Sequence, residues 1–209
     1  MRKLLLRFSL FSLVFLLVFS CKSYELKNVK SIKSENTTFE NLYFSSNEDY
    51  VYKCQIDIYK HHLSGILIIK KITENKHRVA LTTDFGNKLM DFEISDNKLK
   101  INYIIPDLDK EMVKNFLKKD FTILLKKDFP ISSEFENETE NIFVSENEKE
   151  IFYWFVNKEN HFPEKLIFTE NGKEKINFLF TPKTAIFADE IRINHKDFKI
   201  NILLQKLDL

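Results

Sequence analysis

Apolar and polar residues alternate with a period of two over much of the stretch from residue 50 to residue 104. That period sends successive side chains to opposite faces of a strand, so it predicts half-buried β-strands. The clearest stretch runs from Tyr52 to Ile58. Turn-forming residues at 61–62, 84–87 and 96–97 separate the alternating stretches. The pattern therefore predicts about five strands joined by short turns, which is an antiparallel meander.

The period changes to that of a helix between Leu108 and Leu125. Apolar residues recur three and four positions apart, and lysines fill the other side. Asp107 is placed to cap the first turn, and Pro130 blocks a longer helix. Burying the apolar face would contribute on the order of 10 kcal/mol gross, at roughly 1.5–3 kcal/mol per large side chain. The helix is therefore expected to lie on an apolar surface.

Alternation resumes after an acidic loop at 131–141 and predicts about six more strands up to residue 204. A sheet of about eleven antiparallel strands has to curl. The fold class is therefore mainly β: a curved, unclosed half-barrel whose concave apolar face is covered by the mid-chain helix as a lid. The predicted lining of this interior is Tyr52, Ile56, Ile58, Met90, Phe92, Ile101, Tyr103, Met112, Phe116, Phe121, Phe178 and Phe180.

An interior of this kind suits an acyl chain, which needs a dry concave surface without oriented polar partners. Soft side chains such as Met and Phe repack around a flexible ligand. The same residues would also serve as an ordinary filled core, because cavity and core produce the same alternation. The sequence leaves both interpretations open.

The N-terminus carries the most specific signal. Three basic residues within the first seven precede an uncharged apolar run over residues 8–20, which is shorter than the roughly 20 residues that span a bilayer. These features predict a signal peptide over residues 1–20, and this segment is expected to form an N-terminal signal helix. An uncleaved helix is the alternative. Residues 21–39 are rich in Lys, Ser, Asn and Glu and predict a tether, which leaves 40–209 as one domain.

The run Val18-Phe19-Ser20-Cys21 resembles the lipobox of bacterial lipoproteins, although Phe19 is larger than the residue usual at its position. The resemblance implies that Cys21 is the lipid attachment site and the mature N-terminus. An ordinary secretory signal followed by a chance cysteine is the competing interpretation. Acyl chains on Cys21 would hold the chain at a membrane, since each buried methylene contributes about 0.8 kcal/mol.

Composition narrows the function classes. The chain has 32 Lys and Arg against 31 Asp and Glu, which argues against a nucleic-acid binder with a broad basic surface. The 3 glycines are too far apart for a phosphate-binding loop or a dinucleotide fingerprint. The 2 cysteines exclude a disulfide framework and a Cys-rich zinc site. No cofactor and no metal is expected.

Catalytic candidates are few. His61 and His62 fall on a predicted turn, and the other histidines lie singly without ligand spacing. Asp91 and Glu93 share one strand face and could serve a hydrolase as paired carboxylates, but a solvated strand face explains them as well. Cys54 falls on the apolar face of its strand and is expected to pack as a small hydrophobe. The chain is therefore predicted not to be an enzyme.

The order of these features (lipobox, tether, meander, amphipathic helix, second meander) resembles that of LolA/LolB-like lipoprotein carriers and receptors. The resemblance covers residues 40–209 and rests on pattern. It implies an unclosed barrel under a helical lid that binds acyl chains of lipoproteins. It also implies a membrane-insertion residue on the loop between the third and fourth strands, which here is Phe85 in the stretch 83–88. The alternative is that Phe85 folds over the end of its own hairpin.

The predicted function is a membrane-anchored envelope lipoprotein that binds acyl chains of lipids or lipoproteins and aids lipoprotein localisation or insertion. Its expected place is the bacterial outer membrane, facing the periplasm. The alternative is a non-catalytic structural or assembly subunit of an outer-membrane complex that binds an envelope protein partner. The expected partners are thus the membrane, acyl chains and such a protein, and no nucleic acid.

Overall fold

The computed structural model describes residues 23–95 and 97–207. Cys21 and the predicted signal peptide over 1–20 lie outside the described residues, so their roles stay predictions. Within the described part, no helix combines the length and the apolar character needed to cross a membrane.

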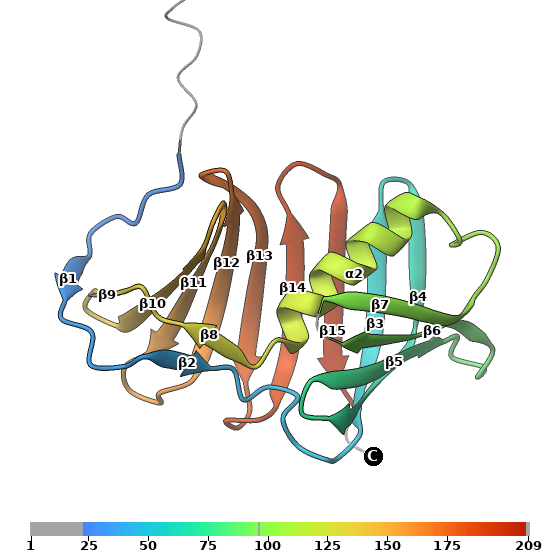
Figure 1. Ribbon diagram of the computed structural model, residues 1–209. Helices are drawn as coiled ribbons and strands as arrows, with labels where there is room; N and C mark the ends of the chain where they lie inside the picture. The colour runs from blue at the N-terminus through green and yellow to red at the C-terminus, as the bar shows by residue number, and fades with distance from the viewer. Residues whose placement is uncertain (1–22, 96, 208–209) are drawn as a thin grey trace, which may run out of the picture.

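One antiparallel sheet holds nearly all the described strands (Figure 1). It is 13-stranded, in the order β1-β9-β10-β11-β12-β13-β14-β15-β3-β4-β5-β6-β7, and β2 and β8 form a second small sheet. The strands are β1 (Lys30–Ile32), β2 (Thr38–Glu40), β3 (Tyr50–Ile58), β4 (His61–Thr73), β5 (Lys76–Thr82), β6 (Lys88–Ser95), β7 (Lys98–Ile104), β8 (Asp128–Pro130), β9 (Ser133–Glu136), β10 (Glu140–Asn147), β11 (Glu150–Asn157), β12 (Pro163–Glu170), β13 (Lys173–Pro182), β14 (Ala188–His195) and β15 (Ile200–Lys206). Apart from the short β1 and β9, the large sheet consists of the two predicted meanders, β3–β7 and β10–β15.

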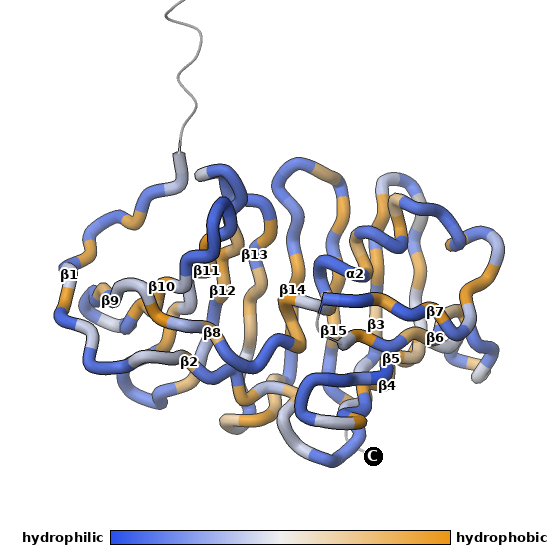
Figure 2. The backbone as a smooth tube through the Cα atoms, viewed as in Figure 1, coloured by the Kyte–Doolittle hydropathy of each residue, from blue (hydrophilic) through white to orange (hydrophobic). Residues whose placement is uncertain are grey.

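The two meanders join where β15 pairs with β3, and the sheet stays open because its edge strands β1 and β7 do not pair with each other. The sheet curves, and helix α2 (Glu111–Leu125) lies across its concave side (Figure 1). Apolar stretches follow the strands while the turns at their ends are mostly polar (Figure 2). The predicted mainly β, unclosed half-barrel with one covering helix is confirmed.

The start of the helix differs from the prediction. Residues 105–110 form turns, in which the Leu108 N–H donates to the Ile105 carbonyl at 3.0 Å, and the helix begins at Glu111. The N-cap residue is Lys110, without a side-chain capping bond. Asp107 therefore does not cap the helix, because the chain makes a further turn before the helix starts.

Two other local predictions are wrong. The turn expected at His61–His62 lies at the two preceding residues, and β4 already begins at His61. Tyr59, in that turn, takes a positive φ of 55°. In β7, the pairing with β6 shifts register: Asp91 lies opposite Tyr103, but Phe92 lies opposite Ile101. This bulge breaks the period of two and places Tyr103 on the outer face of the sheet, 45% exposed.

Residues 23–32, at the start of the predicted tether, lie along the outer face of the sheet, whereas Phe39 near its end packs against Trp154 of the main core. We call residues 23–32 the strap. The Tyr24 N–H donates to the Gly172 carbonyl at 2.7 Å, and the Tyr24 ring lies 4.8 Å from that of Tyr153. The strap ends in β1, which pairs with β9. Its apolar side chains cover a small outer cluster formed by Ile142, Val144, Phe155 and Ile167.

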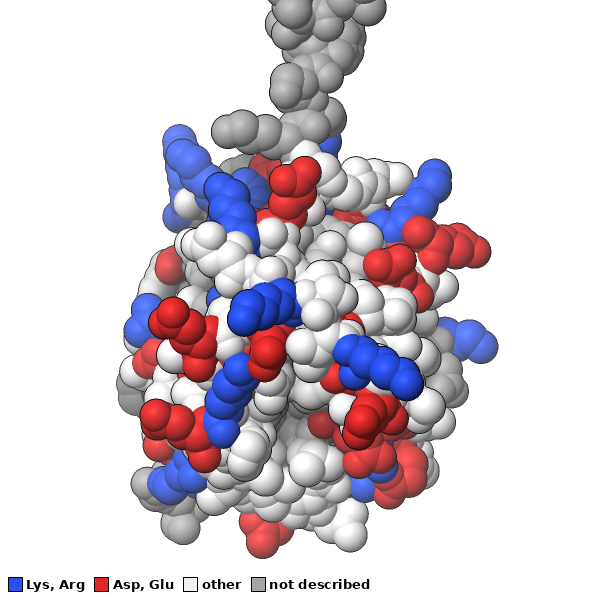
Figure 3. Space-filling model, turned by 90° about the vertical axis from the view of Figure 1, so that its left-hand side faces the viewer, with Lys and Arg blue, Asp and Glu red and all other residues white. Residues whose placement is uncertain are grey.

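The surface mixes charges of both signs. On the face seen in Figure 3, which carries the strap side of the molecule, Lys and Arg alternate with Asp and Glu without a large area of one sign. This distribution agrees with the near-balance of charges in the sequence and gives no basic surface for a nucleic acid on this face.

Candidate functional site

The concave face of the sheet and the inner face of α2 enclose one large apolar core. Most of the predicted lining residues meet there, with exposures between 0% and 5%: Tyr52, Ile56, Met90, Phe92, Phe121, Phe178 and Phe180. Ile58, Ile101 and Phe116 are half-buried at its margin. Met112 is 43% exposed on the first turn of the helix, and Tyr103 lies on the outer face. The fold therefore brings together all the lining candidates except Met112 and Tyr103.

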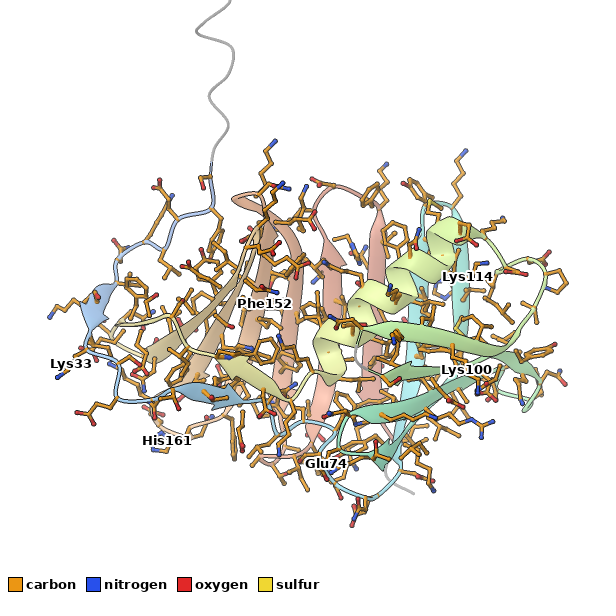
Figure 4. All side chains as sticks on the ribbon, in the orientation of Figure 1. Lys33, Glu74, Lys100, Lys114, Phe152 and His161 are labelled. Atoms are coloured by element: carbon orange, nitrogen blue, oxygen red, sulfur yellow. The ribbon has the colours of Figure 1, made fainter. Side chains whose placement is uncertain are left out.

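Side chains of the chain itself fill this interior. The Phe121 ring of the helix meets that of Phe92 at a centroid distance of 5.2 Å. Phe180 stacks between Tyr43, at 4.9 Å, and Trp154, at 5.8 Å. Figure 4 shows Phe152 within the curve of the sheet, near the end of the helix. The helix is therefore packed directly onto a filled core.

Few polar groups reach the interior, and most of those are satisfied. The Tyr43 hydroxyl donates to the Pro163 carbonyl at 2.8 Å, and the Tyr52 hydroxyl donates to the Ala188 carbonyl at 3.1 Å. Burial raises the pKa of both tyrosines, so both stay neutral. The indole N–H of Trp154 is buried and has no acceptor among the described residues. This N–H is therefore an unsatisfied hydrogen-bond donor in an otherwise apolar interior.

A buried Asp–His pair joins the helix to the sheet. Asp120 lies on the inner face of α2 and is 0% exposed. Nε2 of His195, at the end of β14, lies 3.0 Å from each carboxylate oxygen and donates to Oδ2. Oδ1 has no hydrogen bond of its own from another described residue. Burial raises the pKa of Asp120, and the hydrogen bond from His195 acts in the opposite direction. We call this pair the latch.

The latch is an ionisable contact, unlike the aromatic contacts around it. A buried carboxylate is costly unless it is paired, so the pair favours the closed position of the helix. The Phe116 ring lies edge-on to the His195 ring, with the two ring centres 5.2 Å apart, so it packs beside the latch. Next to the latch, Lys119 of the helix pairs with Glu150 of β11 at 2.5 Å, so ionisable contacts join the middle of the helix to the sheet at two neighbouring residues.

A groove runs along the C-terminal half of the helix. Two adjoining hollows of about 390 and 330 Å³ share Asn97, Thr122 and Lys126 in their walls. Buried apolar residues, Ile94 and Leu125 in one and Phe152 in the other, form part of their lining. Burial lowers the pKa of Lys126, whose ammonium lies over the Phe129 ring at 4.7 Å. The groove therefore reaches buried residues of the core beside the helix.

The two strand carboxylates that could have served a hydrolase belong to an ion-pair network on the outer face. Arg78 donates to both oxygens of Asp91, at 2.9 and 2.6 Å, and this pairing lowers the pKa of Asp91 to about 2. Hydrogen bonds from Lys76 and Asn102 lower the pKa of Glu93 to about 2. Carboxylates held in the ionised form do not supply a proton near neutral pH, so this pair does not form a general acid and base.

His62, His77 and Cys54 lie apart from one another and from the latch. His62 pairs with Asp57 at 2.7 Å on the surface, and His77 is buried against the Phe44 carbonyl at 3.1 Å. Burial raises the pKa of the Cys54 thiol to about 12, as for a packed hydrophobe. Among residues 23–95 and 97–207, no group of three or more His, Cys, Asp or Glu is placed to hold a metal ion.

Phe85 lies at the tip of the β5–β6 hairpin and is 94% exposed. Gly86 beside it takes a positive φ of 84°, which the turn requires. The ring therefore does not fold over the end of the hairpin. A fully exposed phenylalanine on a short turn is a candidate contact for an apolar partner.

Sequence reasoning missed the latch and the strap, although both left signals. Asp120 interrupts the apolar face of the helix between Leu117 and Leu124, at helical spacing, which is where a buried acid needs a partner. The strap shows Tyr24, Leu26 and Val29 within a polar stretch. His195, the partner of Asp120, and the outer cluster under the strap are both distant in sequence from the segments they contact. The sequence pattern alone therefore could not predict either contact.

No family model and no curated protein matches this sequence. Solved structures with the same architecture exist. A LolA superfamily protein from Nitrosomonas europaea is 10% identical and superposes with a TM-score of 0.52 over 80% of this chain and 87% of its own. A domain from Vibrio parahaemolyticus, whose name refers to outer-membrane lipoprotein sorting, is 9% identical with a TM-score of 0.45 over 78% of this chain and 85% of its own. Of these two, the first shows that the fold is LolA-like.

Proposed function

We propose that this protein is a lipid-anchored envelope protein that takes an acyl chain of a lipid or lipoprotein into its apolar interior and aids lipoprotein localisation or insertion. The observation that carries the proposal is a continuous apolar core divided between a curved sheet and one helix, with the ionisable latch fastening the two. When the helix lifts, the sheet presents a concave apolar surface of the kind that acyl chains fill.

The proposal treats the filled interior as the empty, closed form of the carrier. Apolar side chains without a ligand would collapse onto the helix, because exposing them to water is unfavourable by about 25 cal/mol per Å². Met90 and the phenylalanines of the core can change rotamer and readmit a flexible chain. The proposed entry path is the groove beside Thr122, whose walls already include the buried residues Ile94 and Phe152.

Acylation of Cys21 would place the carrier at the outer membrane, facing the periplasm, and the exposed Phe85 would contact the bilayer during delivery. The lipobox and the 94% exposure of Phe85 support these two steps. Replacement of Phe85 by Glu is expected to impair transfer of an acylated lipoprotein to vesicles while leaving the thermal unfolding midpoint nearly unchanged. A large fall in that midpoint would instead make Phe85 a structural residue.

The test of cargo binding uses the chain from residue 22 to residue 209 and a fatty acid that carries a pyrene label. Saturable uptake of one probe per chain is expected. Asp120→Asn, which weakens the latch, should accelerate uptake several-fold in stopped-flow fluorescence. Asp107→Asn is the matched control, because Asp107 is an exposed acid just before the same helix. Absence of saturable uptake by both the wild type and Asp120→Asn would contradict the proposal.

The packed interior also favours a second candidate, a non-catalytic assembly subunit of an outer-membrane complex. Such a subunit would use its filled half-barrel as a scaffold and bind an envelope protein along the open edge strand β7, where Tyr103 is 45% exposed. Under this alternative the labelled fatty acid would not bind, and Tyr103→Ser would weaken assembly of the complex.

A further inference from the structure

Large apolar side chains are exposed together at one end of the sheet. Tyr59 in the β3–β4 turn is 50% exposed, Phe198 in the β14–β15 turn is 46% exposed, and Met112 in the first turn of α2 is 43% exposed. The two β-turns lie side by side, because the Tyr59 N–H donates to the Lys199 carbonyl at 2.8 Å. We call the three segments 57–62, 111–116 and 196–199 the rim.

The helix continues this apolar surface. Phe116 follows Met112 by four residues, so both side chains lie on one face of α2. The Phe116 ring meets that of Phe198 edge-on at a centroid distance of 5.2 Å. Turns normally carry small polar residues, and an aromatic residue at positive φ, as at Tyr59, is uncommon. Exposed aromatic side chains at these positions suit an apolar partner better than water.

Charges on the rim favour an anionic partner. Each of its three acids has a partner within the chain: Asp57 contacts His62, Glu111 pairs with Lys114 and Asp197 pairs with Lys175. By contrast, Lys60 and Lys199 have no ion-pair partner among the residues that the structure describes. Two unpaired lysines beside exposed aromatic rings match the surface of a bilayer that contains anionic lipid.

The described chain begins at the same end of the sheet. The Ser23 hydroxyl donates to the Gly172 carbonyl at 3.2 Å, in the β12–β13 turn. Strands β12, β13 and β14 alternate in direction, so this turn and the β14–β15 turn of the rim share one end. Figure 1 shows the start of the described chain and both rim turns at the top. The residues before Ser23, with the apolar run 8–20 and Cys21, therefore join the domain on the rim side.

We infer that the rim docks on the surface of a lipid bilayer containing anionic lipid, with Tyr59, Phe198 and Met112 in the headgroup region. Tyrosine and similar amphipathic rings are favoured at that depth. This site is distinct from Phe85, whose hairpin between β5 and β6 lies at the right of Figure 1. A consequence that rests on the proposed function is that docking acts on the lid, because Phe116 touches both Phe198 of the rim and His195 of the latch.

Vesicle flotation tests the inference with the chain from residue 22 to residue 209, so that no lipid anchor contributes. The vesicles contain phosphatidylethanolamine with about one third phosphatidylglycerol, and a parallel set contains phosphatidylcholine alone. The double variant Tyr59→Ser/Phe198→Ser is expected to bind the anionic vesicles about tenfold more weakly than the wild type. Ile72→Ser is the matched control, because Ile72 is 47% exposed near the opposite end of β4. It should bind like the wild type.

The charge variant Lys60→Glu/Lys199→Glu leaves the core untouched. It decides the outcome if circular dichroism shows that the serine variant is unfolded. It should weaken binding to anionic vesicles and leave the weak binding to phosphatidylcholine unchanged. The inference is overturned if the wild type does not float with anionic vesicles, or if Ile72→Ser loses as much binding as the rim variants. It is also overturned if Phe85→Ser alone abolishes flotation. Rim-dependent flotation without uptake of the pyrene-labelled fatty acid would refute the carrier function and leave the docking surface standing.

Discussion

Asp120 joins the covering helix to the sheet through a buried ionisable contact. Its carboxylate is buried on the inner face of the helix and pairs with His195 at 3.0 Å. Removing one partner of a buried pair leaves the other without compensation. We expect His195→Ala to lower the free energy of unfolding by about 3 kcal/mol in urea denaturation. Replacing both partners by Leu should cost less than either single change to Ala, and an equal or greater loss in the double variant would show that the pair is not coupled.

Asp91 is expected to make stability depend on pH in acid. Arg78 holds the folded pKa of Asp91 near 2, below the ordinary value of 3.8. The folded state therefore binds the proton less readily than the unfolded state, so this contribution is complete above about pH 4 and is lost as pH falls towards 2. Because Arg78 is 51% exposed, the loss should be only about 1 kcal/mol. Asp91→Asn should remove this part of the pH dependence in urea titrations between pH 5 and pH 2.

At the residue scale, the sequence predicted burial better than it predicted partners. Alternation placed Tyr52, Ile56 and Phe178 on the concave face correctly, since a period of two admits only two faces. Alternation placed Tyr103 on the wrong face, because the β-bulge in β7 adds one residue that the hydrophobic pattern does not predict. Ion pairs such as Arg78 with Asp91 bring together side chains from neighbouring strands, and they become visible only when the register is known.

The strap is the element whose presence the sequence did not suggest. Its polar composition predicted a tether, yet a few apolar side chains suffice to cover the outer cluster. The lid was predicted well because 15 helical residues carry a long amphipathic repeat, whereas its first turn depends on local turns before Lys110. Long periodic elements are thus readable from sequence, and short segments that bind a distant surface are not.

Deletion of residues 23–29 is expected to expose the outer cluster. The sheet should persist, because β10–β13 pair without the strap, and the far-ultraviolet circular dichroism should stay nearly unchanged. Exposure of Ile142, Val144, Phe155 and Ile167 should instead increase the fluorescence of an added hydrophobic dye and promote self-association. The single change Ser31→Ala, on the exposed side of the strap, is the control that should behave like the wild type. Unchanged dye binding after the deletion would mean that the strap covers nothing.

At the scale of the whole molecule, the curved sheet and helix α2 form two parts of one core rather than a closed barrel. The strand count, the curl and the covering helix followed from periodicity and from the size of the sheet. Whether the interior was open or filled did not follow, because both use the same residues. The structure shows it filled, with the helix packed onto the core.

Native mass spectrometry of the chain from residue 22 to residue 209, purified from cells without detergent, tests the central claim most directly. A carrier should retain cargo, so we predict a population with one additional acyl-bearing species per chain, released when the gas-phase activation energy is raised. Asp120→Asn should exchange that species faster with added labelled fatty acid. A single mass equal to that of the bare chain, both before and after incubation with the fatty acid, would contradict the account.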